Sequence, residues 1–236
     1  MEEQNTEIQL IAMCRDIKDI FIWGSSSHAG CTIEIIEKKG IHNIDFLYDP
    51  TLDKDIKKHG YEVISCSFKE LKVLLKDRKT KGVIVAVGNN FVRKKVYQRI
   101  KNEVELYFVN AIHKSCIISD SALLGKGIVM LAGSIVGRNS CIGEGAFIGT
   151  KSTVGHDTIV GDYSNVLMGS SVAGKCDLKK TSVVAMGSNV IQETNIGEGS
   201  VVGAGSLVVD DIPAGVIAYG SPAEVVRDRP DEYKYL

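Results

Sequence analysis

The chain lacks the features that mark several common classes of protein. Its 28 Lys and Arg balance 29 Asp and Glu without forming a basic stripe, so its charge gives no support to nucleic acid binding. No apolar run approaches the roughly 20 residues of a membrane span. The six cysteines are scattered, with no CxxC pair and no secretory leader, which predicts reduced thiols in a cytoplasmic protein. The five histidines form no cluster with cysteines, so we expect no metal site.

What the chain has in abundance is a six-residue period. From residue 118 to residue 208 an apolar residue returns at every sixth position, a mostly small residue stands two places before it, and glycine often follows it. This period fits neither an α-helix at 3.6 residues nor a flat strand at 2. Hexapeptide repeats are typical of a parallel β-helix. The apolar positions are Ile118, Leu124, Met130, Val136, Ile142, Ile148, Val154, Val160, Val166, Val172, Leu178, Val184, Val190, Ile196, Val202 and Val208.

We interpret this part of the chain as a left-handed prism with three short strands in each coil. The apolar residue points into the prism, the small residue fits where the chain bends, and glycine permits turn conformations that a Cβ would penalise. Six residues on each of three faces place residue i directly below residue i+18. His156 is therefore expected one coil below Gly174.

The preceding part of the chain has a different pattern, in which strands alternate with helices. This order predicts a small parallel α/β sheet of Rossmann type. The expected strands are 20–23, 46–48, 82–87 and 106–109, and the expected helices are 32–39, 68–76 and 92–101. The predicted domains are an N-terminal extension at 1–19, a Rossmann-like domain at 20–109, a β-helix domain at 110–222 and a C-terminal tail at 223–236.

Ligands of such sheets bind at the carboxyl ends of the strands, which here carry the loops 24–30, 49–50 and 88–90. The first loop lacks the central glycine of a GxGxxG dinucleotide motif and has Ser26 there, which disfavours an NAD site. Its serines and the following helix N-terminus suit a phosphate, while a plain tight turn is an equal alternative. A ligand contact by His28, in the same loop, is compatible with either reading.

His156 is the candidate catalytic residue in the prism. It follows Gly155 at a repeat turn, outside the interior positions, and precedes Asp157. Imidazole commonly serves as a general base near neutral pH, and a neighbouring carboxylate can fix its tautomer. An exposed histidine is more often structural, but its place on a β-helix face favours a catalytic base.

Several stretches resemble one family of enzymes. They are the loop Gly24–Gly30, the strand end Leu47-Tyr48-Asp49, the run Val85–Lys95 with its Gly-Asn-Asn-x-x-Arg-Lys-Lys pattern, the entry Asn110–Cys116, the turn Val154-Gly-His156-Asp157, and the closing Val202–Gly205 and Tyr219–Ala223. The family is the sialic acid O-acetyltransferase (NeuD-type) group. Within it the chain, over residues 20–223, is most similar to PglD-like sugar-nucleotide 4-amino N-acetyltransferases of bacterial glycosylation pathways.

This resemblance implies direct transfer of acetyl from acetyl-CoA to the C4 amine of a UDP- or dTDP-linked 4-amino-4,6-dideoxyhexose, without a metal. It implies a homotrimer with acetyl-CoA between adjacent prisms. His156 would be the base, Asp157 its orienting carboxylate, and Gly174 N–H the oxyanion donor. The residues implied for acetyl-CoA are Asn165, Gly174, Met186, Ala204, Gly205 and Pro222. Those implied for the nucleotide sugar are Ser26, Ser27, His28, Asp49 and Asn89.

The chain also departs from these relatives. Asn165 stands where they carry a second histidine that holds acetyl-CoA, and Gly149 replaces a polar residue near the acceptor amine. Two alternatives therefore remain: O-acetylation of sialic acid or another sugar hydroxyl, and an inactive β-helix scaffold. Apolar stretches at 166–168 and 183–186 predict a flat face that is buried between subunits.

Overall fold

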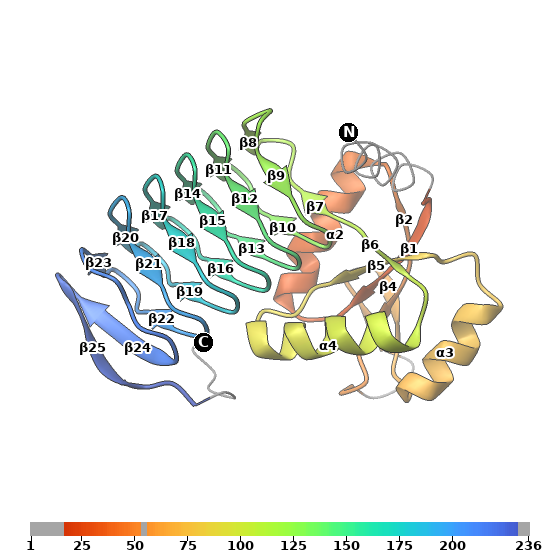
Figure 1. Ribbon diagram of the computed structural model, residues 1–236. Helices are drawn as coiled ribbons and strands as arrows, with labels where there is room; N and C mark the ends of the chain where they lie inside the picture. Colours follow the sequence, from red (N-terminus) through yellow and green to blue (C-terminus); the bar gives the residue numbers. More distant parts are fainter. Residues whose placement is uncertain (1–16, 53–55, 231–236) are drawn as a thin grey trace. The chain divides into compact units, whose positions relative to one another are not determined.

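The computed structural model describes residues 17–52 and 56–230, which fall into two compact units (Figure 1). The first unit comprises the chain up to Val87 together with Tyr97–Ala111, and the second comprises Gly88–Val96 together with the chain from Ile112 onward. Sequence analysis placed one boundary between residues 109 and 110. The structure adds residues 88–96 to the β-helix unit. Residues 1–16 of the expected extension and 231–236 of the expected tail lie outside the described residues.

The first unit is the predicted Rossmann-like α/β sheet. Its six strands lie in the order β3-β4-β2-β1-β5-β6, and every neighbouring pair is parallel except β3–β4. The strands are β1 (Asp19–Trp23), β2 (Asn43–Tyr48), β3 (Ile56–Lys58), β4 (Tyr61–Ile64), β5 (Gly82–Val85) and β6 (Tyr107–Phe108). The helices are α2 (Ser27–Lys39), α3 (Phe68–Lys76) and α4 (Asn90–Glu103), of which α4 begins in the second unit.

Two local features differ from the expected elements. Helix α2 begins at Ser27, five residues before the expected start at 32, because the extended Ser26 already serves as its N-cap. The β3–β4 hairpin was not expected. His59 and Gly60 form its two-residue turn with φ of 52° and 87°, the positive values that tight hairpin turns require.

The second unit is a parallel β-helix, as the hexapeptide period predicts (Figure 1). Its two-residue strands pair with strands 18 residues away, so that Phe147 pairs with Asn165 and Thr153 with Ser171. Three stacks result, in the orders β24-β22-β19-β16-β13-β10-β7, β23-β20-β17-β14-β11-β8 and β21-β18-β15-β12-β9. The strands are β7 (Ala111–Ile112), β8 (Ile117–Ile118), β9 (Leu123–Leu124), β10 (Val129–Met130), β11 (Ile135–Val136), β12 (Cys141–Ile142), β13 (Phe147–Ile148), β14 (Thr153–Val154), β15 (Ile159–Val160), β16 (Asn165–Val166), β17 (Ser171–Val172), β18 (Asp177–Leu178), β19 (Val183–Val184), β20 (Asn189–Val190), β21 (Asn195–Ile196), β22 (Val201–Val202), β23 (Leu207–Val208) and β24 (Val216–Gly220).

The predicted apolar column is the core of the prism. From Met130 to Val208 each of its residues is buried, while Ile118 and Leu124 at the first coils are partly buried. The small residues form a second buried column whose hydroxyls are hydrogen-bonded. Ser164 Oγ donates to Lys179 O at 2.8 Å and Ser188 Oγ to Gly203 O at 2.8 Å, each 15 residues ahead. Small polar residues therefore recur because they satisfy buried turn carbonyls as well as fitting the bend.

The C-terminal end of the β-helix is closed by an antiparallel hairpin of β24 and β25 (Ala223–Asp228). Residues 223–228, which were expected at the start of the C-terminal tail, form the second strand of this hairpin. The preceding β24 also pairs with β22, which makes the hairpin continuous with one stack of the prism.

The predicted aliphatic face at 166–168 and 183–186 is corrected by the structure. Val166, Val183 and Val184 are 0% exposed, and only Met168 and Met186 expose large apolar side chains there. The exposed aliphatic residues of the two-residue coil strands lie elsewhere. They are Ile117 and Ile135 on the β8–β11 stack and Leu123 and Ile159 on the β9–β12–β15 stack.

The inward and outward positions of one stack should differ sharply in their effect on stability. Ile142→Ala, at an inward position that is 2% exposed, is expected to lower the free energy of unfolding by about 2–5 kcal/mol. The matched change Ile159→Ala, outward on the next coil and 47% exposed, is expected to cost about 0.5 kcal/mol or less. Urea unfolding of both variants measures the difference, and equal losses would contradict the assignment of the two positions.

Candidate active site

His156 lies on one edge of the prism, where stacked turns follow the β11, β14, β17 and β20 strands. Each turn is bonded to the one a coil earlier: Asp157 N–H donates to Arg138 O at 2.8 Å and Lys175 N–H to His156 O at 2.8 Å. We call this the His156 edge and define it by residues 137–139, 155–157, 173–175 and 191–193. The repeat therefore brings residues 18 positions apart into direct contact.

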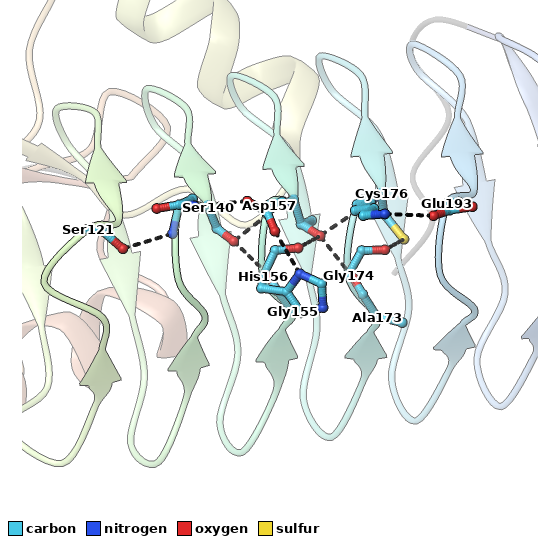
Figure 2. A network of polar contacts seen from close by, with 12 residues as sticks. Ser121, Ser140, Gly155, His156, Asp157, Ala173, Gly174, Cys176 and Glu193 are labelled. Atoms are coloured by element: carbon cyan, nitrogen blue, oxygen red, sulfur yellow. Dashed lines mark hydrogen bonds and ion pairs between the residues drawn. The ribbon is translucent and has the colours of Figure 1, made fainter.

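The predicted His156–Asp157 pair is present (Figure 2). His156 Nδ1 lies 2.8 Å from Asp157 Oδ2, and both side chains are largely exposed. With a proton on Nδ1 donated to the carboxylate, Nε2 carries the lone pair that a general base needs. The hydrogen bond from His156, and then that from Asn139, hold the pKa of the Asp157 carboxyl below its ordinary value. The carboxylate therefore stays ionised as a partner of the imidazole.

Asn139 is a member of the site that sequence analysis missed. Its Nδ2 donates to Asp157 Oδ1 at 3.0 Å, so each oxygen of the carboxylate has a partner. Its own backbone N–H donates to Ser121 Oγ at 3.0 Å, one coil earlier. Figure 2 shows the resulting line of contacts from Ser121 to Asp157. The signal was available in the sequence, because Asn139 precedes Asp157 by 18 residues.

Gly174 lies against the imidazole ring. A Cβ added to it would meet His156 Cε1 and Nε2 at 2.6 Å, far inside van der Waals contact. The glycine is needed here for space, since the ring occupies the volume of the missing side chain. Nearby Cys176 is buried, which raises the pKa of its thiol, so it is not prepared to act as a nucleophile.

The other residues implied for acetyl-CoA are not beside His156 in a single chain. Met186, Ala204 and Gly205 lie on a second edge, formed by the turns 149–151, 167–169, 185–187 and 203–205, which we call the Met186 edge. Met186 is 45% exposed. The two edges flank the same face, the β8-to-β23 stack. Pro222 lies at the turn of the β24–β25 hairpin.

Asn165 has a structural role that the sequence did not reveal. It is 1% exposed, and its Oδ1 accepts a hydrogen bond from the buried Arg93. Arg93 also donates to Gly145 O at 2.7 Å and Tyr163 O at 3.0 Å, which anchors residues 88–96 on the prism. The structure therefore places Asn165 inside this anchor, and as a contact of acetyl-CoA it stays a prediction without support from the geometry.

The loops after β1 and β2 bring most of the residues implied for the nucleotide sugar to one edge of the sheet, because these strands are neighbours. Ser26 and Ser27 are exposed at the start of α2, and Ser26 makes no capping hydrogen bond with its side chain. No acidic residue occupies the first turn of α2, which leaves its positive N-terminal end uncompensated by this helix. His28 is half-buried in the same turn.

Asp49 is held by three hydrogen bonds. It accepts from Ser25 Oγ at 2.7 Å, Thr51 Oγ1 at 2.7 Å and Thr51 N–H at 3.1 Å. Partial burial alone would raise its pKa, but the bonds from Thr51 and Ser25 outweigh that effect and hold the pKa below the ordinary value. Asp49 is therefore a fixed, ionised acceptor. Asn89 belongs to the second unit, where its Oδ1 accepts from Val92 N–H at 3.0 Å and caps α4.

His59 is a second residue that was not singled out from the sequence. Its Nε2 lies 3.3 Å from Ser25 O and 3.2 Å from Ser26 O, so it bonds the β3–β4 turn to the loop after β1. The ring packs on Gly30, where a Cβ would lie 2.9 Å from His59 Cε1. The second glycine of the 24–30 loop thus makes room for the His59 ring.

Two general expectations can be compared with the part of the chain that the structure describes. Within residues 17–52 and 56–230, no three His, Cys, Asp or Glu side chains are grouped so as to hold a metal ion. The helices found in these residues are too short or too polar to cross a membrane.

The chain resembles known proteins over most of its length. Residues 19–100 match the PglD N-terminal domain family. A histidine-to-asparagine variant of perosamine N-acetyltransferase from Caulobacter crescentus, solved with CoA and GDP-perosamine, is 30% identical with a TM-score of 0.84, over 90% of this chain and 98% of that one. The chain belongs to the PglD-type acetyltransferase family. The acetyltransferase domain of PglB from Neisseria gonorrhoeae, solved with acetyl coenzyme A, is 25% identical with a TM-score of 0.79 over 89% and 99% of the two chains.

A curated relative of this PglD-type chain is UDP-N-acetylbacillosamine N-acetyltransferase from Bacillus subtilis, 32% identical over 124 residues. The match spans about half the length of that relative, 52%, and 49% of this chain. These relatives confirm the predicted family and the predicted combination of a Rossmann-like domain with a β-helix. Solved relatives bind CoA or acetyl-CoA, in agreement with the predicted co-substrate.

Filling the space beside Gly174 should displace the imidazole. We expect Gly174→Ala to push the ring away from its position beside Asp157 and to lower kcat by about 10²-fold or more, because a misplaced base loses most of its contribution. The control is Gln192→Ala, at the same place in the next turn of the His156 edge, which should leave kcat unchanged. A Gly174→Ala enzyme of normal kcat would show that the contact is incidental.

Removing Asn139 should be visible at the Asp157 carboxyl. Asn139→Ala deletes one of the hydrogen bonds that lower the Asp157 pKa, so that pKa is expected to rise toward its ordinary value. A carbon-13 NMR titration of the carboxyl groups measures the change. The pKa of Asp211, lowered mainly by Asn195, serves as an internal reference and should stay constant. An unchanged Asp157 titration would mean that the Asn139 contact does not persist in solution.

Proposed function

We propose that the protein transfers the acetyl group of acetyl-CoA to the amino group of a nucleotide-linked sugar. The observation that carries this proposal is the His156–Asp157 pair, with the ring held against Gly174 by the coil repeat. The relatives add support. One is named for a UDP-linked amino sugar, and another was solved with GDP-perosamine bound. The finer proposal is the C4 amine of a 4-amino-4,6-dideoxyhexose linked to UDP or dTDP, and the GDP-perosamine relative adds GDP as a nucleotide to be tested.

The reaction we propose is direct attack on the thioester. The amine lone pair forms the C–N bond as the carbonyl becomes a tetrahedral oxyanion, and His156 Nε2 takes the proton that the nitrogen loses. Asp157 stabilises the imidazolium at Nδ1. Gly174 N–H donates to the oxyanion. The C–S bond then breaks, and the proton on Nε2 neutralises the departing CoA thiolate. No covalent enzyme intermediate is required.

A homotrimer follows from this proposal together with the positions of the two edges. The His156 edge and the Met186 edge lie on opposite sides of the β8-to-β23 face, so one chain does not bring the base to the residues proposed for acetyl-CoA. A threefold arrangement around that face would set the Met186 edge of one copy against the His156 edge of the next. Exposed Ile117 and Ile135 make part of this face apolar, as an interface requires.

The nucleotide sugar is proposed to bind over the loops after β1 and β2. The α2 N-terminus with exposed Ser26 and Ser27 suits the diphosphate, because its backbone N–H groups point outward. Asp49 is an ionised acceptor suited to a sugar or ribose hydroxyl. His28, in the same turn, belongs to the proposed set. Asn89 lies in the second unit, and its contact with the nucleotide sugar stays an expectation from the resemblance.

The alternatives use the same prism. An O-acetyltransferase acting on sialic acid or another sugar hydroxyl would keep the His156–Asp157 pair but would not need the nucleotide loops. An inactive scaffold would not require the His156–Asp157 hydrogen bond or a glycine at position 174 that leaves space for the imidazole ring. The amine acceptor is therefore the function that the site supports best, and a cytoplasmic location remains a prediction from sequence.

The decisive test is release of CoA thiol from acetyl-CoA with UDP-, dTDP- and GDP-linked 4-amino-4,6-dideoxyhexoses. His156→Ala should lower the rate by about 10²–10⁴-fold, the usual contribution of a general base. His113→Ala changes a partly exposed histidine that contacts Ser115; it is the matched control and should retain full activity.

The outcomes separate the three functions. Release with one nucleotide sugar, lost in His156→Ala, supports the proposal and identifies the nucleotide. Activity only on sialic acid or other hydroxyl acceptors favours O-acetylation. Binding of acetyl-CoA without transfer to any acceptor, unaffected by His156→Ala, favours a scaffold.

A further inference from the structure

Thr158 connects the turn that carries His156 with the turn that carries Gly174. Its side chain is fully buried, and its Oγ1 donates to Ala173 O at 2.9 Å and accepts from Cys176 N–H at 3.2 Å. His156 O lies farther away, at 3.3 Å. The hydroxyl therefore donates its one hydrogen bond to the Ala173 carbonyl, which belongs to the peptide unit joining Ala173 to Gly174.

This hydrogen bond fixes the direction of the Gly174 N–H group. The Ala173–Gly174 peptide is trans, and in a trans peptide the C=O and N–H groups point to opposite sides. Because the carbonyl points to the buried Thr158 hydroxyl, the N–H points away from it, on the side of the turn remote from Thr158. Across residues 17–52 and 56–230, no hydrogen bond uses the Gly174 N–H as a donor. The Gly174 N–H is therefore a donor of fixed direction without an acceptor in these residues, and Gly174 lies beside the His156 ring.

The same type of hydrogen bond recurs in other turns without this consequence. Ser140 Oγ donates to Gly155 O at 2.5 Å, and Ser164 Oγ donates to Lys179 O at 2.8 Å. The residue after Lys179 is the exposed Lys180, on a third edge of the prism that carries neither His156 nor Met186. The bond of Ser140 orients the Gly155–His156 peptide, whose N–H belongs to His156 itself. The bond of Thr158 orients the peptide whose N–H belongs to Gly174, the residue that lies against the imidazole.

We propose that Thr158 is a positioning residue that aims the Gly174 N–H at the thioester oxygen of acetyl-CoA. This inference rests on the proposed function and extends it. When the nucleophile adds to the carbonyl carbon, the π electron pair moves to oxygen, and a donor fixed in advance stabilises that charge without reorganising. The charge disappears when the carbonyl re-forms and the C–S bond breaks. Thr158 contacts neither substrate and takes no proton in this sequence.

The test compares Thr158→Val, which removes the hydroxyl at nearly constant size, with Thr158→Ser, which retains it. We expect Thr158→Val to lower kcat by about 10–100-fold, part of the roughly 10²–10³-fold that loss of an oxyanion donor costs. KM for acetyl-CoA and the pH profile should stay as in the wild type, because neither the base nor the binding surface changes. Thr158→Ser should restore most of kcat.

Ser164→Ala is the matched control for a purely structural role. It deletes the equivalent hydrogen bond on the third edge and should leave kcat within about twofold of the wild type while lowering the melting temperature as much as Thr158→Val does. Equal losses of kcat in the two variants, or a wild-type kcat in Thr158→Val, would overturn the proposal.

A second reaction tests the role of Thr158 independently of the proposed amino-sugar acceptor. Slow hydrolysis of acetyl-CoA, with water as nucleophile, develops the same oxyanion without an amino sugar. A hydrolysis rate that falls in Thr158→Val but not in Ser164→Ala supports the role of Thr158 even if every amino-sugar acceptor fails. Hydrolysis that is equal in wild type and Thr158→Val, together with equal transfer rates, refutes it.

Discussion

The structure depends on one constraint, the 18-residue register that stacks each coil on the next. Backbone hydrogen bonds such as Asp157 N–H to Arg138 O and Lys175 N–H to His156 O hold this register at the turns. Three contacts of the candidate site repeat the same step: Ser121 to Asn139, Asn139 to Asp157, and His156 to Gly174. Residues far apart in the sequence are thus aligned without any loop having to fold over the site. A one-residue insertion in a coil would separate the partners that flank it, because each strand has only two residues with which to absorb a shift.

The interior of the prism links stability to chemistry. A buried carbonyl at each bend must be satisfied, and a hydroxyl from the preceding coil does this repeatedly. Fixing a carbonyl also fixes the N–H of the same peptide, on the opposite side. The repeat therefore orients backbone N–H donors along its edges, whether or not the turns carry a catalytic side chain. A histidine, a carboxylate and a glycine at adjacent turns are then enough to complete a candidate site on a fold that already supplies the geometry.

Sequence reasoning succeeded where a single period or cap decides the structure. The apolar column gave the β-helix and the contact of His156 with Gly174, and helix α3 was predicted at its observed bounds, where Ser67 and Glu70 form a capping box. It failed where tertiary packing decides. The β3–β4 hairpin is short and polar, and β25 is largely exposed, so neither shows a clear hydrophobic alternation. Asn165 occupies an outward position of the repeat, and its burial could not be inferred without knowing that Arg93 lies on that face.

The separation of the two edges explains why assembly and catalysis would be coupled in the proposed enzyme. One face of the prism spans six residues, roughly 20 Å of extended chain at most, whereas a general base must come within about 3 Å of its proton. The side chains proposed to bind acetyl-CoA on the Met186 edge therefore cannot serve His156 of the same chain unless the thioester reaches across the intervening face. A neighbouring copy removes this distance, since it presents its Met186 edge where the first copy presents its base. Apolar Ile117 and Ile135 on the face between the edges would then contribute to catalysis only through assembly, without contacting either substrate.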